Sequence, residues 1–356
     1  MTEDLIHLIS FWRDMMSKEP RNISTSTDFS HVIMRITLTL CRRLTIGVNI
    51  RKRLVGYFAL IVIGGLFGDY LPNFVSSVIP FQTSKRGFLN QWFVKIGWFW
   101  TIILLGPFIH MTSQISSTKE SSSKSDLHRS YHEKSLRDDS SPSSRPSSRS
   151  SSHVKRDSNS PLIVKLWITL SNKDLLRLWV NTLFWYLSTS AFTWFESITI
   201  SCSSGEFSTQ ESCTKSGNKW IGFDISGHTF ILLFSLLVIM EECSIMKGWE
   251  PFGERLFAEQ QNRQRTFRQD YPQHVIYSKY KIYIRCFFLA LTGLTLIWNF
   301  MLFQTALFYH TTLQKLIAYL WAVGLWFFGY KCLYNSKYFS SVFKNEADLF
   351  PVSLMY

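Results

Sequence analysis

Residues 222–235 read GFDISGHTFILLFS, and this stretch joins a polar turn to a long apolar run. The apolar run continues to about residue 243, which gives it the length of a membrane-spanning helix. Asp224 and His228 therefore lie where the chain would enter a bilayer. A histidine at that place needs an explanation, because its side chain titrates near neutral pH.

Similar apolar windows recur along the 356 residues of the chain. Together they predict six transmembrane helices, at residues 54–71, 91–111, 176–198, 225–243, 285–308 and 313–334. The expected fold is therefore all-α, that of a polytopic membrane protein. A cleavable signal peptide is not expected, because MTEDLIHLISFW at the N-terminus lacks a basic region and a small-residue cleavage site.

The formal net charge of +13 raises nucleic acid as a possible partner. The Lys and Arg residues gather beside the apolar windows, however, where they set the topology of membrane proteins, so we expect no nucleic-acid binding. Six spans place four basic segments together on the cytosolic side: the N-terminal arm 1–53, the loop 113–160, the loop 244–284 and the tail 335–356. Both termini are then cytosolic, with one pair of helices in 54–112 and four helices in 161–334. The segments left for the lumenal side are 72–90, 199–224 and 309–312.

Two of the cytosolic segments have a marked composition. The loop 113–160 is rich in serine and charge, so it cannot bury enough apolar surface to fold and is predicted to be disordered. Within the N-terminal arm, HVIMRITLTLCRRL at 31–44 is compatible with an interfacial amphipathic helix and equally with an irregular arm.

The predicted topology brings two histidines to one rim of the membrane. His228 begins the fourth span, and His310 lies in the short turn between the fifth and sixth. Phosphoryl transfer needs a nucleophile or base, an acid for the leaving oxygen, and cations for the phosphate. Lys85 and Arg86 precede the second span on the same side and can supply the cations. The alternative, that these are ordinary interfacial histidines, stays open on composition alone.

The residues beside His228 suit an anion site. Gly227 permits close approach to the backbone, and the N–H groups that begin the helix can hold a phosphate. Asp224 can cap that helix or orient an imidazole. Asn299 lies eleven positions before His310 on nearly the same helix face, where it either lines a cavity or bonds to a neighbouring helix.

No metal or cofactor is expected, because His228 and His310 are only two candidate ligands and the sequence has no HExxH or CxxC spacing to complete a site. Of the six cysteines, Cys202 and Cys213 fall together in the predicted lumenal loop 199–224. Oxidation is permitted there, so a disulfide between them is predicted. Glu241 and Glu242 end the fourth span and are interpreted as boundary residues.

Three segments carry a resemblance to a known family: TSKRGFLNQWFVKIGWFWT at 83–101, GFDISGHTFILLFSLLVIMEE at 222–242 and YHTTLQK at 309–315. They resemble the fat storage-inducing transmembrane (FIT) family of the endoplasmic reticulum, in order over about 54–334. That family is similar to the lipid phosphate phosphatases, so the resemblance implies a lipid phosphatase-like fold. It further implies a multi-pass protein of the endoplasmic reticulum membrane, with its active site facing the lumen.

The resemblance also implies an activity, that of a fatty acyl-CoA diphosphatase. The pyrophosphate would be cleaved to give acyl 4'-phosphopantetheine and adenosine 3',5'-bisphosphate, in support of lipid droplet biogenesis and membrane homeostasis. Ser226, Gly227 and His228 match the SGH motif, whose histidine protonates the leaving group, and His310 matches the attacking histidine.

The sequence departs from the phosphatase pattern at two positions. Gln304 and Gln314 stand where the third motif has an Arg and an Asp, and the first motif is not found. We therefore expect Asp224, Lys85 and Arg86 to supply the orienting carboxylate and the phosphate contacts. Two alternatives remain: a non-catalytic protein that binds di- or triacylglycerol and partitions it into droplets, and a phosphatase acting on phosphatidic acid.

Overall fold

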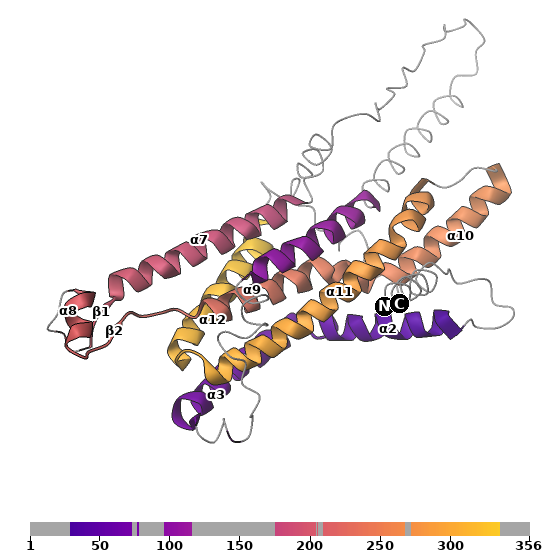
Figure 1. The fold of residues 1–356 in the computed structure, drawn as a ribbon. Helices are drawn as coiled ribbons and strands as arrows, with labels where there is room; N and C mark the ends of the chain where they lie inside the picture. The colour runs from indigo at the N-terminus through magenta and orange to yellow at the C-terminus, as the bar shows by residue number, and fades with distance from the viewer. Residues whose placement is uncertain are drawn as a thin grey trace, which may run out of the picture.

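The computed structural model describes residues 29–72, 77, 96–115, 175–203, 205, 209–267 and 272–334. These residues are mainly helical (Figure 1). The long helices are α2 (Phe29–Thr45), α3 (Ile50–Tyr70), a helix through 97–115, α7 (Leu176–Thr199), α9 (Gly227–Glu242), α10 (Trp249–Phe267), α11 (Pro272–Phe308) and α12 (Thr312–Phe327). A 3-10 turn, η3 (Cys243–Lys247), follows α9, and a π-helical turn, η4 (Phe328–Leu333), ends α12.

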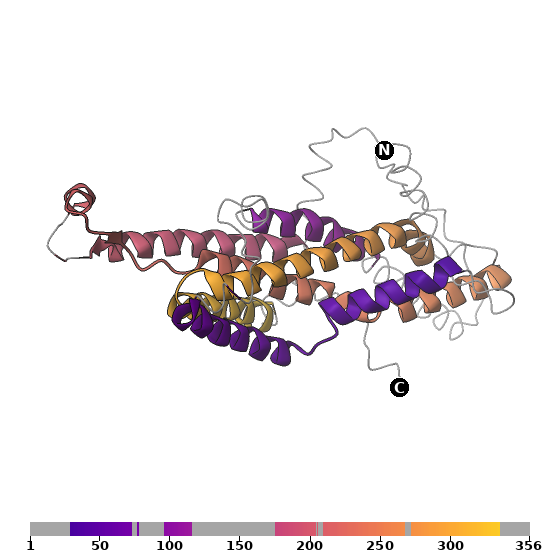
Figure 2. The same ribbon diagram turned by 60° about the horizontal axis from the view of Figure 1, so that its bottom comes forward.

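Helix α9 forms the centre of the fold. Every side chain from Thr229 to Met240 is buried, as expected for a helix that is apolar on all sides. It packs against α11 and α12, and α3 packs against the same two helices. In both views α12 lies between α7 and α3 (Figures 1 and 2). The apolar run of the opening stretch therefore forms the core.

Helix α3 approaches its neighbours closely because it carries glycines. A Cβ atom added at Gly68 would lie 2.1 Å from the backbone oxygen of Leu307, and one added at Gly65 would lie 2.5 Å from Oγ1 of Thr312. Small residues allow such contacts between membrane helices. The end of α3 is thereby held against the turn that joins α11 to α12.

Gly68→Ala is expected to destabilise the protein by about 1–3 kcal/mol, because the new methyl group must displace backbone. The matched control is Gly56→Ala in the same helix, where an added Cβ meets no atom within 4 Å. The measurement is the thermal unfolding midpoint of purified protein in detergent. Equal midpoints for the two variants would contradict the close packing of α3.

Three helices of the described residues are long and apolar enough to cross a membrane: Gly227–Asn262, Gln273–Phe308 and Thr312–Leu333. They cover the spans predicted at 225–243, 285–308 and 313–334, except for residues 225, 226 and 334. The windows predicted at 54–71 and 176–198 are helical as α3 and α7, and the described part of 91–111 is helical as well. Six crossings remain a prediction.

The structure differs from the sequence interpretation on the predicted loop 244–284. Most of it is helical, as η3, α10 and the first turns of α11. Trp249, Leu256 and Tyr277 are buried there, so the helices form because they bury apolar side chains against the core. The sequence did not indicate these helices, because many polar residues separate the apolar positions that become buried.

The segment 31–44 is helical within α2, so the irregular-arm alternative is wrong. Met34, Leu38 and Cys41 are buried, and α2 packs against α11 and η3. The serine-rich loop beyond residue 115 and the tail 335–356 lie outside the described residues.

Candidate active site

The first turn of α9 carries His228. Ser226 is the N-cap: its Oγ accepts a hydrogen bond from the N–H of Thr229 at 3.3 Å and lies 2.9 Å from the Thr229 hydroxyl. Ser226 is fully buried, so its side chain serves to begin the helix. A Cβ atom added at Gly227 would meet nothing within 4 Å. The space beside the backbone next to His228 is therefore open.

The segment that leads into α9 is fixed to two other helices. Gly222 passes so close to α7 that an added Cβ would lie 2.9 Å from the backbone oxygen of Glu196. The N–H of Phe223 donates to Oγ1 of Thr199 at 3.0 Å. The N–H of Ser226 donates to the backbone oxygen of Gln314 in α12 at 3.4 Å. The start of α9 is thus tied to the end of α7 and the start of α12.

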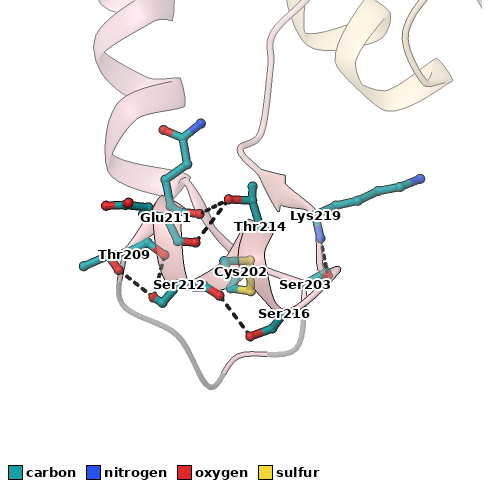
Figure 3. The surroundings of a disulfide bond; sticks show 10 residues. Cys202, Ser203, Thr209, Glu211, Ser212, Thr214, Ser216 and Lys219 are labelled. Carbon is teal, nitrogen blue, oxygen red and sulfur yellow. Dashed lines mark hydrogen bonds between the residues drawn. A yellow bond between two sulfur atoms is a disulfide. The ribbon is translucent and has the colours of Figure 1, made fainter.

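A disulfide-bonded hairpin precedes this segment (Figure 3). Strand β1 (Ser201–Cys202) pairs antiparallel with β2 (Trp220–Ile221), and the short helix α8 (Gln210–Lys215) lies between them. Cys202 and Cys213 form a disulfide. The N–H of Lys219 also donates to Oγ of Ser203 at 3.1 Å. These links brace the chain immediately before Gly222, and the two short strands are the one exception to the all-α expectation among the described residues.

His310 adopts a left-handed backbone conformation with a φ of 57°. That conformation is unfavourable for a residue with a side chain, so the surroundings must hold it. Thr311 and Gln314 form a capping box at the start of α12. Asp69, at the end of α3, accepts from the N–H of Thr312 at 2.9 Å and from its hydroxyl at 2.6 Å.

Lys315 also stabilises the turn between α11 and α12. Its Nζ donates to the backbone oxygen of Ala306 at 2.7 Å, and the side chain is buried. One ammonium group therefore joins the last turn of α11 to the first turn of α12, on either side of His310. Sequence reasoning missed both Lys315 and Asp69, although Lys315 lies within the quoted segment YHTTLQK and Asp69 lies near the end of the first predicted span, 54–71.

The structure brings His228 and His310 together. Their ring centroids are 6.4 Å apart and the rings are inclined at 46°. Reacting atoms must approach to about 3–3.5 Å, and a catalytic acid must lie within about 2.6–3.2 Å of the oxygen it protonates. A centroid separation of this size is short enough for both imidazoles to reach the same phosphoryl group.

Asp224 faces His310. Its Oδ2 lies 3.4 Å from Nδ1 of His310, and the two side chains are 51% and 19% exposed. A carboxylate beside Nδ1 favours the tautomer in which Nδ1 carries the proton and Nε2 keeps its lone pair. Asp224 was expected either to cap α9 or to orient an imidazole. Ser226 caps α9, and the position of Asp224 beside Nδ1 of His310 suits the second role.

The other candidate residues are placed as follows. Oδ1 of Asn299 accepts from the Tyr57 hydroxyl at 2.9 Å, and its Nδ2 donates to the backbone oxygen of Thr295 at 2.7 Å, which makes Asn299 a link between α11 and α3. Lys85 and Arg86 lie outside the described residues. Within the part of the chain that the structure describes, no three His, Cys, Asp or Glu side chains gather as a metal site would require.

A family model for fat storage-inducing transmembrane proteins matches residues 78–138 and 198–330, more than half of the chain, with Asp224 and both histidines inside the match. The chain belongs to the FIT family. Within this FIT protein, Asp69 lies outside the matched residues, and Lys315 lies inside them.

Several relatives carry the name acyl-coenzyme A diphosphatase FITM2. The Drosophila melanogaster protein is 27% identical over 326 residues, which cover 88% of this chain and 65% of the relative. The Caenorhabditis elegans protein is 23% identical, covering 92% of this chain and 93% of its own. The human protein is 26% identical, with 85% and 91% covered. This FIT protein thus spans about two thirds of the fly relative and nearly all of the other two. No solved structure matches it.

Proposed function

We propose that this FIT protein is a fatty acyl-CoA diphosphatase of the endoplasmic reticulum membrane. The observation that carries the proposal is the pair of imidazoles, His228 and His310, with the Asp224 carboxylate at Nδ1 of His310. The shared name of the relatives supports the same activity. The products are acyl 4'-phosphopantetheine and adenosine 3',5'-bisphosphate, and the reaction supports lipid droplet biogenesis and membrane homeostasis.

The proposed reaction has two steps. Nε2 of His310 attacks one phosphorus of the pyrophosphate, the bond from that phosphorus to the bridging oxygen breaks, and His228 donates a proton to that oxygen. In the second step, water attacks the phosphorus and loses a proton to His228, and the phosphorus–nitrogen bond breaks. One water molecule is consumed and both histidines return to their starting states.

The phosphate charge is proposed to be held at the start of α9. The open space beside Gly227 lets a phosphate oxygen approach the N–H groups of the first turn, where the helix dipole favours an anion. Lys85 and Arg86 are proposed as further contacts. With six spans and cytosolic termini, this end of the helices faces the lumen.

Asp224→Asn is expected to lower kcat for oleoyl-CoA about 10- to 100-fold with little change in KM, as is typical when the partner that orients a functional histidine is lost. The matched control is Glu211→Gln, a carboxylate in α8 that is 80% exposed and paired with Lys215. Steady-state kinetics in detergent distinguish the two. A loss confined to KM in Asp224→Asn would argue for a binding role instead of orientation.

The function is tested by offering the purified protein oleoyl-CoA and phosphatidic acid in the same detergent. Release of adenosine 3',5'-bisphosphate from oleoyl-CoA, with slow or no phosphate release from phosphatidic acid, is the expected result. The reverse preference would make the protein a lipid phosphatase. Turnover of neither substrate, together with binding of di- or triacylglycerol that survives His228→Ala, would favour a neutral-lipid carrier.

A further inference from the structure

A basic pocket of about 870 Å³ lies at the opposite end of α9 from the imidazoles. Its walls come from α2, the turn between α2 and α3, the end of α9, η3 and η4. Glu241, which lines it, follows His228 by thirteen residues, or about 20 Å along the helix axis. The pocket is therefore separate from the site of the proposed reaction.

Four of the side chains that line the pocket are cationic. Arg42, Arg43, Lys247 and Lys331 face one carboxylate, Glu241, whose Oε1 lies 3.0 Å from Nζ of Lys331. Within the described part of the chain, no carboxylate pairs with the other three cations. The pocket therefore carries a net charge of about +3, and an anion bound there would meet cations from α2, η3 and η4.

The outer surface of α2 adds an apolar element. Ile36, Leu40 and Leu44 follow one another in steps of four residues, so they lie along one side of the helix. They are 63%, 54% and 41% exposed. Val48, in the next turn of the chain, is both exposed and part of the pocket lining. An apolar side next to a cationic pocket is the pattern of a membrane-interface site.

We propose that this pocket binds the head group of an anionic phospholipid that carries a phosphomonoester, of the phosphorylated inositol type. Basic pockets beside membrane helices bind such head groups. A volume of about 870 Å³ admits a sugar-sized head group, and the three cations not paired with Glu241 complement its phosphates. The acyl chains would lie along Ile36, Leu40 and Leu44. With the termini in the cytosol, the lipid belongs to the cytosolic leaflet.

The test uses the full-length protein in detergent and dioctanoyl phosphatidylinositol 4-phosphate as the probe, with binding followed by thermophoresis. Arg43→Gln/Lys247→Gln is expected to weaken binding about tenfold or more, since each cation at such a site strengthens binding severalfold. The matched control is Arg51→Gln/Lys52→Gln, which removes the same charge from neighbouring residues that do not line the pocket. Equal losses in both double variants would overturn the proposal in favour of diffuse attraction.

A variant that is expected to strengthen binding excludes misfolding as the explanation of weaker binding. Glu241→Gln removes the one acidic side chain of the pocket and releases Lys331, so it is expected to strengthen binding severalfold. A damaged protein does not bind a ligand more tightly. Unchanged or weaker binding by this variant would count against the pocket.

Three further binding measurements identify the source of the ligand and distinguish this pocket from the histidine site. Dioctanoyl phosphatidylcholine is expected to bind at least tenfold more weakly, because it lacks the phosphomonoester. Free inositol 1,4-bisphosphate or coenzyme A that binds as tightly as the lipid would overturn the lipid assignment in favour of a soluble phosphate. His228→Ala is expected to leave binding unchanged, whereas its loss in that variant would place the probe in the histidine site.

Discussion

Replacing His310 with alanine is expected to reduce the release of adenosine 3',5'-bisphosphate from oleoyl-CoA to background, because the variant has no nucleophile to form the covalent intermediate. Replacing His228 with alanine is expected to slow the reaction about 10²- to 10⁴-fold, the usual contribution of a positioned acid. Both effects are measured on purified protein in detergent, with the thermal unfolding midpoint recorded for each variant.

The matched control is His274→Ala. His274 lies in the first turn of α11, about 50 Å along that helix from the turn that contains His310. It is expected to retain turnover near that of the unchanged protein. Full turnover in both His228→Ala and His310→Ala would contradict the proposed mechanism. A loss of turnover in His274→Ala as large as in those two variants would indicate that any histidine substitution damages the fold.

The predicted arrangement of helices depended on a few long apolar windows. The same windows placed His228 at the start of one span and His310 in the turn between two others. Phe230 to Met240 read as one span because nearly every residue is apolar, and in the structure that helix is the buried centre. The prediction that His228 and His310 lie together followed from counting spans, because it needs only an odd or even number of crossings between them; the structure places their ring centroids 6.4 Å apart. The conformation of His310 could not be predicted, because its φ of 57° is imposed by neighbours from other parts of the chain.

The residues that sequence reasoning missed act through tertiary contacts. Asp69 is 243 positions before Thr312, and nothing local to either residue indicates their hydrogen bonds. The hydrogen bond from Lys315 to the backbone oxygen of Ala306 joins two helices across a turn, and no local pattern around either residue indicates it. Gln314, which stands where the related phosphatases have an Asp, closes a capping box and accepts from the N–H of Ser226, so here it joins two helix starts.

The interpretation of Glu242 as a boundary residue was also incomplete. Its Oε2 lies 3.0 Å from Nη2 of Arg177 in α7, and the two side chains are 5% and 4% exposed. Its Oε1 accepts a hydrogen bond from the Tyr330 hydroxyl at 2.6 Å. Three helical segments therefore meet at one buried carboxylate, at the end of the bundle away from the histidines.

Glu242→Gln is expected to lower the free energy of unfolding by about 3–5 kcal/mol, because it removes the buried charge that faces Arg177 while the guanidinium stays ionised. The measurement is thermal unfolding in detergent. Lys215→Gln, which breaks an ion pair whose side chains are 74% and 80% exposed, is the control and is expected to cost less than about 1 kcal/mol.

The double variant Arg177→Met/Glu242→Gln decides whether the effect belongs to the pair. Removing both charges leaves no ionised group without its partner, and the Gln oxygen can still accept from Tyr330, so most of the lost stability is expected to return. Since this end of the molecule is remote from His228, the double variant is also expected to hydrolyse oleoyl-CoA at a normal rate. A double variant as unstable as Glu242→Gln alone would mean that Glu242 acts through Tyr330 and packing, with no net contribution from the charge of Arg177.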